Sequence, residues 1–497
     1  MNRFCLLFLL IPLSFACGRT DTTITAPEPH PDSESWYGAY LAGQQVGYLR
    51  QMRTRRPDGG FRLYAEHFIS AKTLGRPVAI KMLEVLESSD DFKPIKYFQK
   101  TDGSAGTPYV VRGDRVPPGG GQFRLRSEAG GKIIMEKTYP IEEWTFPQLV
   151  DQIIHTQDLA VGKHWEFRVI NPVDFLPIRV AIAVERQGTE ILNGRTISFF
   201  EITAKMGAVI VHSFVDTAST EPYRIAMPAM DLEYRLDDQS IAKKFSSDDP
   251  AELDLAHFAA VVPTGAPFSS QPDRAVKLKL SRVPFEDLQL EGDFQKIVRT
   301  GPEDWIIELR PVTPAAIFDD RRGESDRDAM RADSAATESA GQDTSSEVAR
   351  VAGAIGETTP IRFAKAAVSW MQRHIRQVPT SIVPTPEVVL AIKQGDCNEF
   401  SALFQGLCRA SGFQCKIASG LAYMDGQFFY HSWNEIRAAE GRWVPVDPIF
   451  GEVPAAVGHF KLIEGDFSAT WRLASFLKTI RIEILDESKF RGNTRYP

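Results

Sequence analysis

Residues 395–407 read Gly-Asp-Cys-Asn-Glu-Phe-Ser-Ala-Leu-Phe-Gln-Gly-Leu, and this stretch sets the fold of the C-terminal part of the chain. Its large apolar residues recur at steps of three and four, at Phe400, Leu403, Phe404 and Leu407, and Gly412 follows as a stop signal. The spacing predicts a helix of about four turns with Cys397 in its first turn. There, unpaired backbone N–H groups and the positive end of the helix dipole favour a thiolate.

A β-hairpin is predicted directly after this helix. Residues 414–423 and 428–436 alternate as strands do, and Asp425-Gly426 between them is a two-residue turn signal. A second turn at 438–441 returns the chain toward Asp447. Centring that turn on Ala439 places Asp447 opposite His431, and directly opposed residues have Cβ atoms ~5 Å apart. A carboxylate at that distance can hold an imidazole N–H.

The order thiol, imidazole, carboxylate is what a cysteine acyl-transfer site needs. The cysteine attacks a carbonyl as thiolate, the histidine moves the proton and the acid orients the histidine. Any protein of this size contains these residue types, so a core cysteine beside a hydrogen-bonded core histidine is the alternative. The placement of Cys397 at a helix start, and of His431 and Asp447 on one hairpin face, favours the catalytic interpretation.

Three motifs make the region from about 358 to 465 resemble the transglutaminase-like superfamily, whose fold is related to papain. They are Gly-Asp-Cys-Asn-Glu (395–399), Tyr-His-Ser-Trp-Asn-Glu (430–435) and Trp-Val-Pro-Val-Asp-Pro (443–448). The resemblance implies that Cys397 is the nucleophile, His431 the base and Asp447 the orienting acid. It also implies that Trp433 lines the substrate site.

The sequence departs from the family pattern at two positions, neither of which carries the chemistry. Ser432 stands where relatives usually have alanine, and Phe400 where many have histidine. The Cys397 backbone N–H would be one oxyanion donor. The second donor is open: Trp370 is a candidate, although its helical spacing with Val368 and Met371 suits a core position better.

The N-terminus predicts export and a lipid anchor. Arg3 precedes an apolar run from Phe4 to Ala16 that is too short to span a bilayer, so residues 1–16 read as a signal peptide. Its end at Cys17 resembles a bacterial lipoprotein signal, which implies lipidation of Cys17 and, in a two-membrane bacterium, the outer membrane. Ser14 and Ala16 also suit ordinary cleavage, which would give a secreted or periplasmic protein. Residues 17–35 are a polar, proline-rich tether.

The fold class predicted for the whole chain is α+β, with an antiparallel β-rich N-terminal domain at 36–255 ahead of the transglutaminase-like domain at 347–497. Turn signals at 42–45, 57–60 and 193–194 separate strands, and one helix is expected near 146–156. A strand-rich stretch at 256–318 either completes the first domain or forms a small module. Residues 319–346 are a solvated linker, and 480–485 a final strand.

Composition limits the partners. A net charge of −7 over 497 residues argues against nucleic acid. The nine histidines show no paired metal-ligand spacing, and no acidic loop has calcium-binding spacing, so no metal or other cofactor is expected. Cys408 and Cys415 either pair in an oxidising compartment or pack as small apolar residues. The sequence does not indicate the oligomeric state.

Two functions remain from the sequence. The first is a cell-envelope thiol enzyme that attacks carboxamide or peptide carbonyls of a protein or peptide through a thioester, as an amidohydrolase, peptidase or transamidase. The second is a catalytically inactive scaffold or binding lipoprotein. The complete trio of Cys397, His431 and Asp447 favours the enzyme, with water as the default acceptor.

Overall fold

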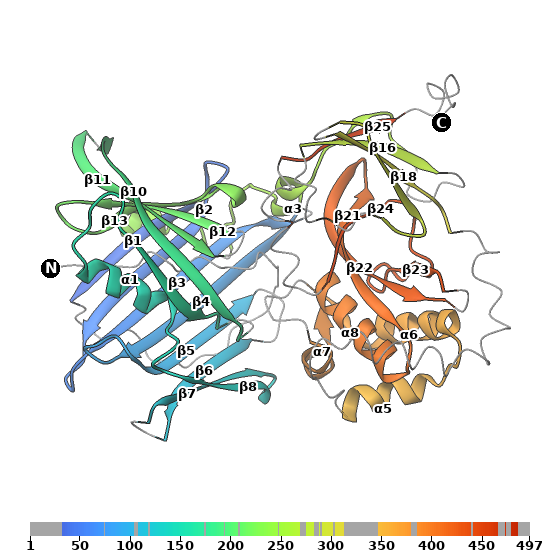
Figure 1. Cartoon of the computed structure of the whole chain (residues 1–497), viewed down its shortest axis with the longest axis horizontal. Helices are drawn as coiled ribbons and strands as arrows, with labels where there is room; N and C mark the ends of the chain where they lie inside the picture. The colour runs from blue at the N-terminus through green and yellow to red at the C-terminus, as the bar shows by residue number, and fades with distance from the viewer. Residues whose placement is uncertain are drawn as a thin grey trace. The chain divides into compact units, whose positions relative to one another are not determined.

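The computed structural model (Figure 1) describes residues 32–485 apart from 74, 104–107, 118–119, 173–174, 193, 207–208, 247, 269–274, 283–287, 289–290, 302–303, 313–345, 379–384, 439–440, 466–472 and 474–478. The expected signal, Cys17, residues 17–31 of the tether and 319–345 of the linker lie outside the described residues. No helix in the described ranges is long and apolar enough to cross a membrane. The chain divides after Leu255 into two compact units, each considered by itself.

The N-terminal unit is built on a 14-stranded antiparallel sheet in the order β8-β7-β6-β5-β4-β3-β2-β1-β14-β13-β12-β11-β10-β9. Because β1 pairs with β14, the first and last strands of the unit lie together in the middle of the sheet. The strands are β1 (Ser33–Leu41), β2 (Gln44–Arg55), β3 (Phe61–Thr73), β4 (Arg76–Ser88), β5 (Pro94–Gly103), β6 (Tyr109–Val116), β7 (Gln122–Ala129), β8 (Lys132–Pro140), β9 (His164–Ile170), β10 (Pro177–Leu192), β11 (Arg195–Met206), β12 (Val209–Asp216), β13 (Pro222–Met227) and β14 (Leu232–Asp237).

Turn chemistry explains the hairpins that the sequence predicted here. Ala42 and Gly43 both have positive φ, 50° and 74°, as the two central residues of a type I′ turn require. Gly194, with φ of 76°, similarly precedes β11. The strands predicted on either side of these turns are confirmed, and the strand predicted from Phe61 begins there as β3.

The predicted helix is confirmed as α1 (Pro147–Thr156), and it is buried on both its apolar and its polar sides. Leu149, Val150 and Ile154 are buried, and Phe146 stacks on Tyr97 with ring centroids 4.7 Å apart. On the polar side, Gln148 donates to the Glu84 carboxyl, which also accepts from the Tyr97 hydroxyl at 2.5 Å. A titratable acid therefore lies inside the core of this unit.

Burial raises the pKa of Glu84 to about 8, against a lowering contribution from the Tyr97 hydrogen bond. Because the folded pKa exceeds the unfolded value of 4.5, stability falls as pH rises from about 4.5 to 8. We expect Glu84→Gln to remove this slope, worth on the order of a few kcal/mol at the alkaline end. Melts of both proteins at intervals across that range check the slope. A wild-type melting temperature that changes with pH as little as that of the variant would contradict a protonated Glu84 in the folded protein.

The C-terminal unit contains a four-stranded sheet, β23-β22-β21-β24, a five-stranded sheet, β15-β25-β16-β18-β17, and a two-stranded pair, β19-β20. Helices α5 and α6 precede β19, α7 lies between β19 and β20, and α8 follows β20. The elements are β15 (Thr264–Gly265), β16 (Val276–Ser281), β17 (Gln295–Arg299), β18 (Asp304–Leu309), α5 (Ser346–Ile355), α6 (Pro360–His374), β19 (Arg376–Gln377), α7 (Pro386–Ile392), β20 (Gln394–Gly395), α8 (Cys397–Ala410), β21 (Cys415–Met424), β22 (Gln427–Arg437), β23 (Trp443–Val446), β24 (His459–Glu464) and β25 (Arg481–Leu485).

The strand-rich stretch after residue 256 neither completes the first unit nor stands alone. Its strand β16 pairs on one side with β18 and on the other with β25 at the far end of the chain, Leu280 opposite Ile482. The stretch and the final strand thus form one sheet within the C-terminal unit. The sequence could not show this, because a pairing of such long range leaves no local signal.

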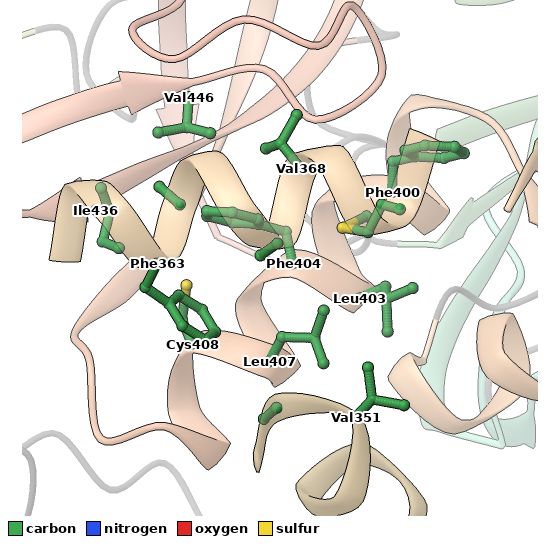
Figure 2. Close-up of a cluster of buried hydrophobic side chains, with 14 of the residues drawn as sticks. Val351, Phe363, Val368, Phe400, Leu403, Phe404, Leu407, Cys408, Ile436 and Val446 are labelled. Carbon is green, nitrogen blue, oxygen red and sulfur yellow. The ribbon is translucent and has the colours of Figure 1, made fainter. Parts of the chain in front are cut away.

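Helix α8 lies in the middle of one of the hydrophobic clusters of this unit, which Figure 2 shows. Phe400, Leu403, Phe404 and Leu407 are fully buried, so the predicted periodicity and helix length are confirmed. Figure 2 also shows the side chains packed around α8, among them Val351, Phe363, Val368, Ile436 and Val446. Phe400 is therefore a core residue, and its departure from the family pattern does not reach the site.

Candidate active site

A capping box fixes the start of α8, and with it Cys397. The Asp396 side chain accepts from the Asn398 N–H at 3.0 Å, and the Glu399 side chain accepts from the Asp396 N–H at 2.8 Å. Position 395 must be glycine, because a Cβ there would lie 2.3 Å from the Glu399 Cβ. Cys397 is the first residue of the helix, and no described hydrogen bond engages its own backbone N–H.

The Cys397 thiol is partly buried and lies beside β22. Burial raises its pKa well above the usual range, and Asp396, Glu399 and Asp447 raise it further, whereas a hydrogen bond from the Ser432 backbone N–H lowers it. Burial and these carboxylates therefore disfavour the thiolate. The sequence indicated a thiol at a helix N-terminus, where the unpaired N–H groups and the helix dipole favour the thiolate, but it did not indicate how many carboxylates lie near the sulfur.

Ser432 connects this strand to the first turn of α8. Its hydroxyl lies 2.9 Å from those of Ser419 and Tyr430, and the Tyr430 hydroxyl donates to Asn398 at 3.1 Å. The hydroxyl at position 432 is thus fully hydrogen-bonded within the unit. Since Ser432 follows His431 directly, its contact with the Cys397 sulfur brings the thiol to the part of β22 that carries the imidazole. No described hydrogen bond joins the thiol to His431.

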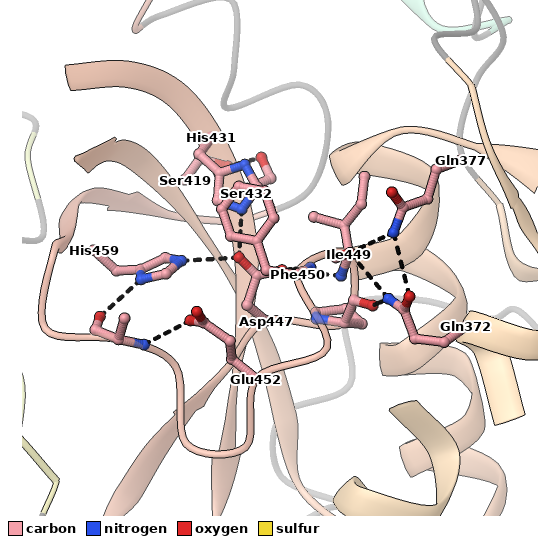
Figure 3. A network of polar contacts seen from close by, with 12 residues as sticks. Gln372, Gln377, Ser419, His431, Ser432, Asp447, Ile449, Phe450, Glu452 and His459 are labelled. Carbon is pink, nitrogen blue, oxygen red and sulfur yellow. Dashed lines mark hydrogen bonds and ion pairs between the residues drawn. The ribbon is translucent and has the colours of Figure 1, made fainter. Parts of the chain in front are cut away.

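The imidazole and the carboxylate are in direct contact. His431 Nε2 lies 2.6 Å from Asp447 Oδ2, and both side chains are buried (Figure 3). The opposite carboxylate oxygen, Oδ1, accepts the backbone N–H groups of Ile449 and Phe450 at 2.9 and 3.0 Å. These contacts hold Asp447 in place and orient the His431 ring.

The register predicted for this hairpin is wrong by two residues. Strand β23 pairs with β22 so that Val446 lies opposite Asn434, and Asp447 comes after the strand has ended. The pairing of Arg437 with Trp443 and the bond from the Ala438 N–H to Arg442 O belong to the same shifted register. An even shift keeps every side chain on its predicted face. For that reason the His431–Asp447 contact exists although the two residues are not cross-strand partners.

A second histidine, His459 at the start of β24, shares the same carboxylate. Its Nε2 lies 2.8 Å from Asp447 Oδ2, and its Nδ1 lies 2.8 Å from the Ala456 carbonyl oxygen (Figure 3). Burial would raise the pKa of Asp447, but His431 and His459 outweigh it and hold that pKa far below its usual range. Sequence reasoning missed His459, since a single histidine in Gly458-His459-Phe460 carries no motif.

Aromatic rings pack on His431. Phe450 stacks on it with centroids 4.6 Å apart and 43% of the Phe450 residue exposed. Trp433, expected to line the substrate site, is only 1% exposed and lies 6.2 Å from the imidazole. Trp433 therefore packs on the His431 ring rather than forming an open surface, and Phe450 is the exposed aromatic side chain of this cluster. Gln372 of α6 donates to Pro448 O and Ile449 O and so ties the Phe450 loop to the helix.

The remaining sequence candidates have simpler roles in the structure. Trp370 is partly buried against the α8 core and stacks on His374, 4.5 Å away. Cys408 is in the core and Cys415 is partly buried, and both are free thiols. Burial and the neighbouring Cys415 thiol raise the pKa of Cys408 well above its usual range.

His431, Asp447 and His459 offer ligand atoms within 4.8 Å of one another, the spacing of a potential metal site among the described residues. The two N–O distances of 2.6 and 2.8 Å are those of charge-assisted hydrogen bonds. Two ligands around one zinc ion at ~2.0–2.2 Å in tetrahedral geometry would lie farther apart. We assign these contacts to shared protons and assign no metal.

The part of the chain that contains this site is similar to one protein family and to two curated proteins. The family model described as the transglutaminase-like superfamily matches residues 349–448. The "Kyphoscoliosis peptidase" proteins of Mus musculus and Homo sapiens are each 29% identical over 103 residues, which is 19% of this chain and 15% of either relative. The chain thus matches only about a seventh of the curated relatives' length.

Three solved structures show weak overall likeness. A beta-barrel-like protein of a domain of unknown function from Brucella abortus aligns over 41% of this chain and 94% of its own, with 8% identity and a TM-score of 0.33. A candidate cysteine protease from Cytophaga hutchinsonii aligns over 42% of this chain and 86% of its own, with 12% identity and a TM-score of 0.27. A candidate protease from Parabacteroides distasonis aligns over 76% of this chain and 65% of its own, with 11% identity and a TM-score of 0.20.

Proposed function

We propose, since residues 349–448 belong to the transglutaminase-like superfamily, that this protein is a cysteine-dependent hydrolase or acyltransferase acting on carboxamide or peptide carbonyls. Cys397 is the nucleophile, His431 the general base and acid, and Asp447 the orienting carboxylate. A protein or peptide is the substrate, and water is the default acceptor.

One observation carries this proposal: Asp447 Oδ2 engages His431 Nε2 at 2.6 Å. A carboxylate accepts hydrogen bonds, so the proton of a neutral His431 ring stays on Nε2. Nδ1 is then unprotonated and able to take a proton from a thiol. Of the described hydrogen bonds, none occupies Nδ1. The ring is therefore in the tautomer that a general base needs, with its acid partner already in place.

The chemistry follows in two halves. As the Cys397 sulfur bonds to the substrate carbonyl carbon, the thiol proton passes to His431 Nδ1, and the carbonyl oxygen becomes an oxyanion. His431 then returns the proton to the leaving amine or ammonia as the C–N bond breaks, which leaves a thioester. Water or an amine attacks the thioester with His431 again accepting a proton, and the thiolate leaves and is reprotonated.

Surroundings that disfavour a thiolate make the base essential. Because Asp396, Glu399 and Asp447 disfavour a thiolate, proton transfer must accompany sulfur attack. The Cys397 backbone N–H, which no described group accepts, is available to the oxyanion. Its position at the first turn of α8 adds the positive end of the helix dipole to that hydrogen bond.

The test is to incubate protein lacking residues 1–17 with cell-envelope proteins and a tagged amine. Tag incorporation means transamidation, release of ammonia without tag means hydrolysis of side-chain amides, and new chain termini mean a peptidase. Cys397→Ala is the control for each. If wild type and Cys397→Ala give the same blank result, the domain is an inactive scaffold and the proposal fails.

We further propose that the protein is held in a bacterial cell envelope by a lipid on Cys17. The support is the short apolar run that ends at this residue. Labelled palmitate is expected to enter the wild type and not Cys17→Ser, and Cys5→Ser is the matched control because Cys5 lies within the signal. Release of the wild type in unlabelled, soluble form would contradict the anchor.

A further inference from the structure

His459 is a buried histidine with a hydrogen-bond acceptor at each end of its ring. Its side chain is 6% exposed. Nε2 faces the Asp447 carboxylate at 2.8 Å, and Nδ1 faces the Ala456 carbonyl oxygen at 2.8 Å. Neither acceptor can donate a proton when Asp447 is ionised.

A neutral imidazole carries one N–H and one bare nitrogen. With either tautomer, a bare nitrogen of His459 would point its lone pair at an oxygen lone pair 2.8 Å away. Such a buried, unfavourable contact costs more than a missed hydrogen bond in water. A proton on each nitrogen removes the conflict and gives two good hydrogen bonds, one of them charge-assisted.

The surroundings of His459 favour the charged form. Asp447 is fully buried beside it, and Glu452 lies nearby, where its carboxylate accepts the Ala456 N–H at 2.8 Å. Among the described residues, the rings that contact it are those of His431, Trp433 and Phe450. Burial lowers the pKa of His459, but the Asp447 hydrogen bond and charge, with a smaller contribution from Glu452, raise it above the usual value.

We propose that His459 is a positioning residue of this site: a buried imidazolium that hydrogen-bonds Asp447, neutralises its charge and so holds the carboxylate that orients His431. The functional part of this inference rests on the proposed thiol chemistry. The protonation state of His459 does not.

The consequence concerns the charge beside the base. Asp447 Oδ2 lies 2.6 Å from His431 Nε2 and 2.8 Å from His459 Nε2. With His459 charged, Asp447 and His459 together carry no net charge. His431 then lies beside a neutral pair instead of beside an uncompensated buried carboxylate.

Histidine ring ¹⁵N NMR tests the protonation state on the full chain without residues 1–17, in the Cys397→Ala background to remove thiol coupling. Both ring nitrogens of His459 are expected at imidazolium shifts at pH 7.5, with the resonances assigned by their loss in His459→Gln. One bare ring nitrogen at that pH would overturn the proposal. This arm needs no turnover, so it stands even if the proposed function fails.

The second arm tests the effect on activity. Gln at 459 keeps a donor toward Asp447 but cannot carry charge. The acid limb of the pH profile of kcat/KM should therefore move to higher pH in His459→Gln, by about one unit or more. His374→Gln, which changes an exposed histidine on α6, is the matched control and should leave the profile unchanged. An unchanged pH profile in a folded His459→Gln protein would overturn the electrostatic role.

Discussion

Replacing Cys397 with alanine is expected to abolish covalent turnover, and replacing His431 with alanine is expected to lower kcat/KM by ~10⁴-fold or more. The reasons differ. Alanine at 397 removes the atom that forms the thioester. Alanine at 431 removes the proposed acceptor of the thiol proton, at a cysteine whose surroundings already disfavour the thiolate. Each substitution is therefore expected to remove nearly all of the rate enhancement that the site provides.

The measurement combines steady-state rates with intact mass after rapid acid quench. A mass increase equal to the acyl group should appear in the wild type and in neither variant. Cys415→Ser, a partly buried thiol on β21 in the same unit, is the control and should retain turnover. Undiminished activity in Cys397→Ala would end the cysteine-enzyme interpretation, and undiminished activity in His431→Ala would assign the base elsewhere.

Asp447→Asn is expected to lower turnover by ~10²- to 10⁴-fold while leaving a measurable rate. Asparagine can still accept the N–H groups of Ile449 and Phe450 through its oxygen. Its amide nitrogen then faces both imidazoles as a donor where Oδ2 was an acceptor for each. His431 must turn or change tautomer to avoid two opposed donors, and the changed tautomer carries its proton on Nδ1, toward the thiol.

The same substitution should reduce stability in a pH-dependent way. His431 and His459 depress the Asp447 pKa. The stabilisation from this carboxylate is therefore fully present above the unfolded pKa of about 4 and is lost as pH falls through the folded value. The melting temperature of Asp447→Asn should lie below that of the wild type at pH 7, and the difference should shrink in acid. A difference that grows toward low pH would show that Asp447 is not ionised in the folded protein.

Much of the C-terminal unit was predictable because its signals are local. The threonine caps at 359 and 385 begin α6 and α7, the periodicity after Cys397 gives α8, and Asp425-Gly426 makes a turn with two positive φ angles. The triad order was readable for the same reason. The register of β22 with β23 could not be predicted, because a shift of the pairing by two residues leaves every side chain on the same face of the sheet.

What the sequence missed depends on contacts of long range. His459 reaches Asp447 only because the loop at 447–458 folds back, with Asp447 and Glu452 exchanging backbone hydrogen bonds. The buried acid Glu84 finds its partner Gln148 on a helix more than sixty residues later. Polar residues of this kind look like surface residues in a linear pattern, because the partner that makes burial tolerable is invisible there.

The pairing of β25 with β16 has a consequence for how the protein is made. Synthesis proceeds from the N-terminus, so β16 and its neighbour β18 emerge long before residues 481–485. Until then the Lys277–Ser281 edge that β25 will cover presents unsatisfied backbone groups. The five-stranded sheet of the C-terminal unit thus closes only after residues 481–485 have been translated, a high-contact-order step that comes after α8 and its hairpin are available to fold. Between the translation of Ser281 and that of Arg481, the nascent chain carries an open sheet edge whose partner strand has not yet been made.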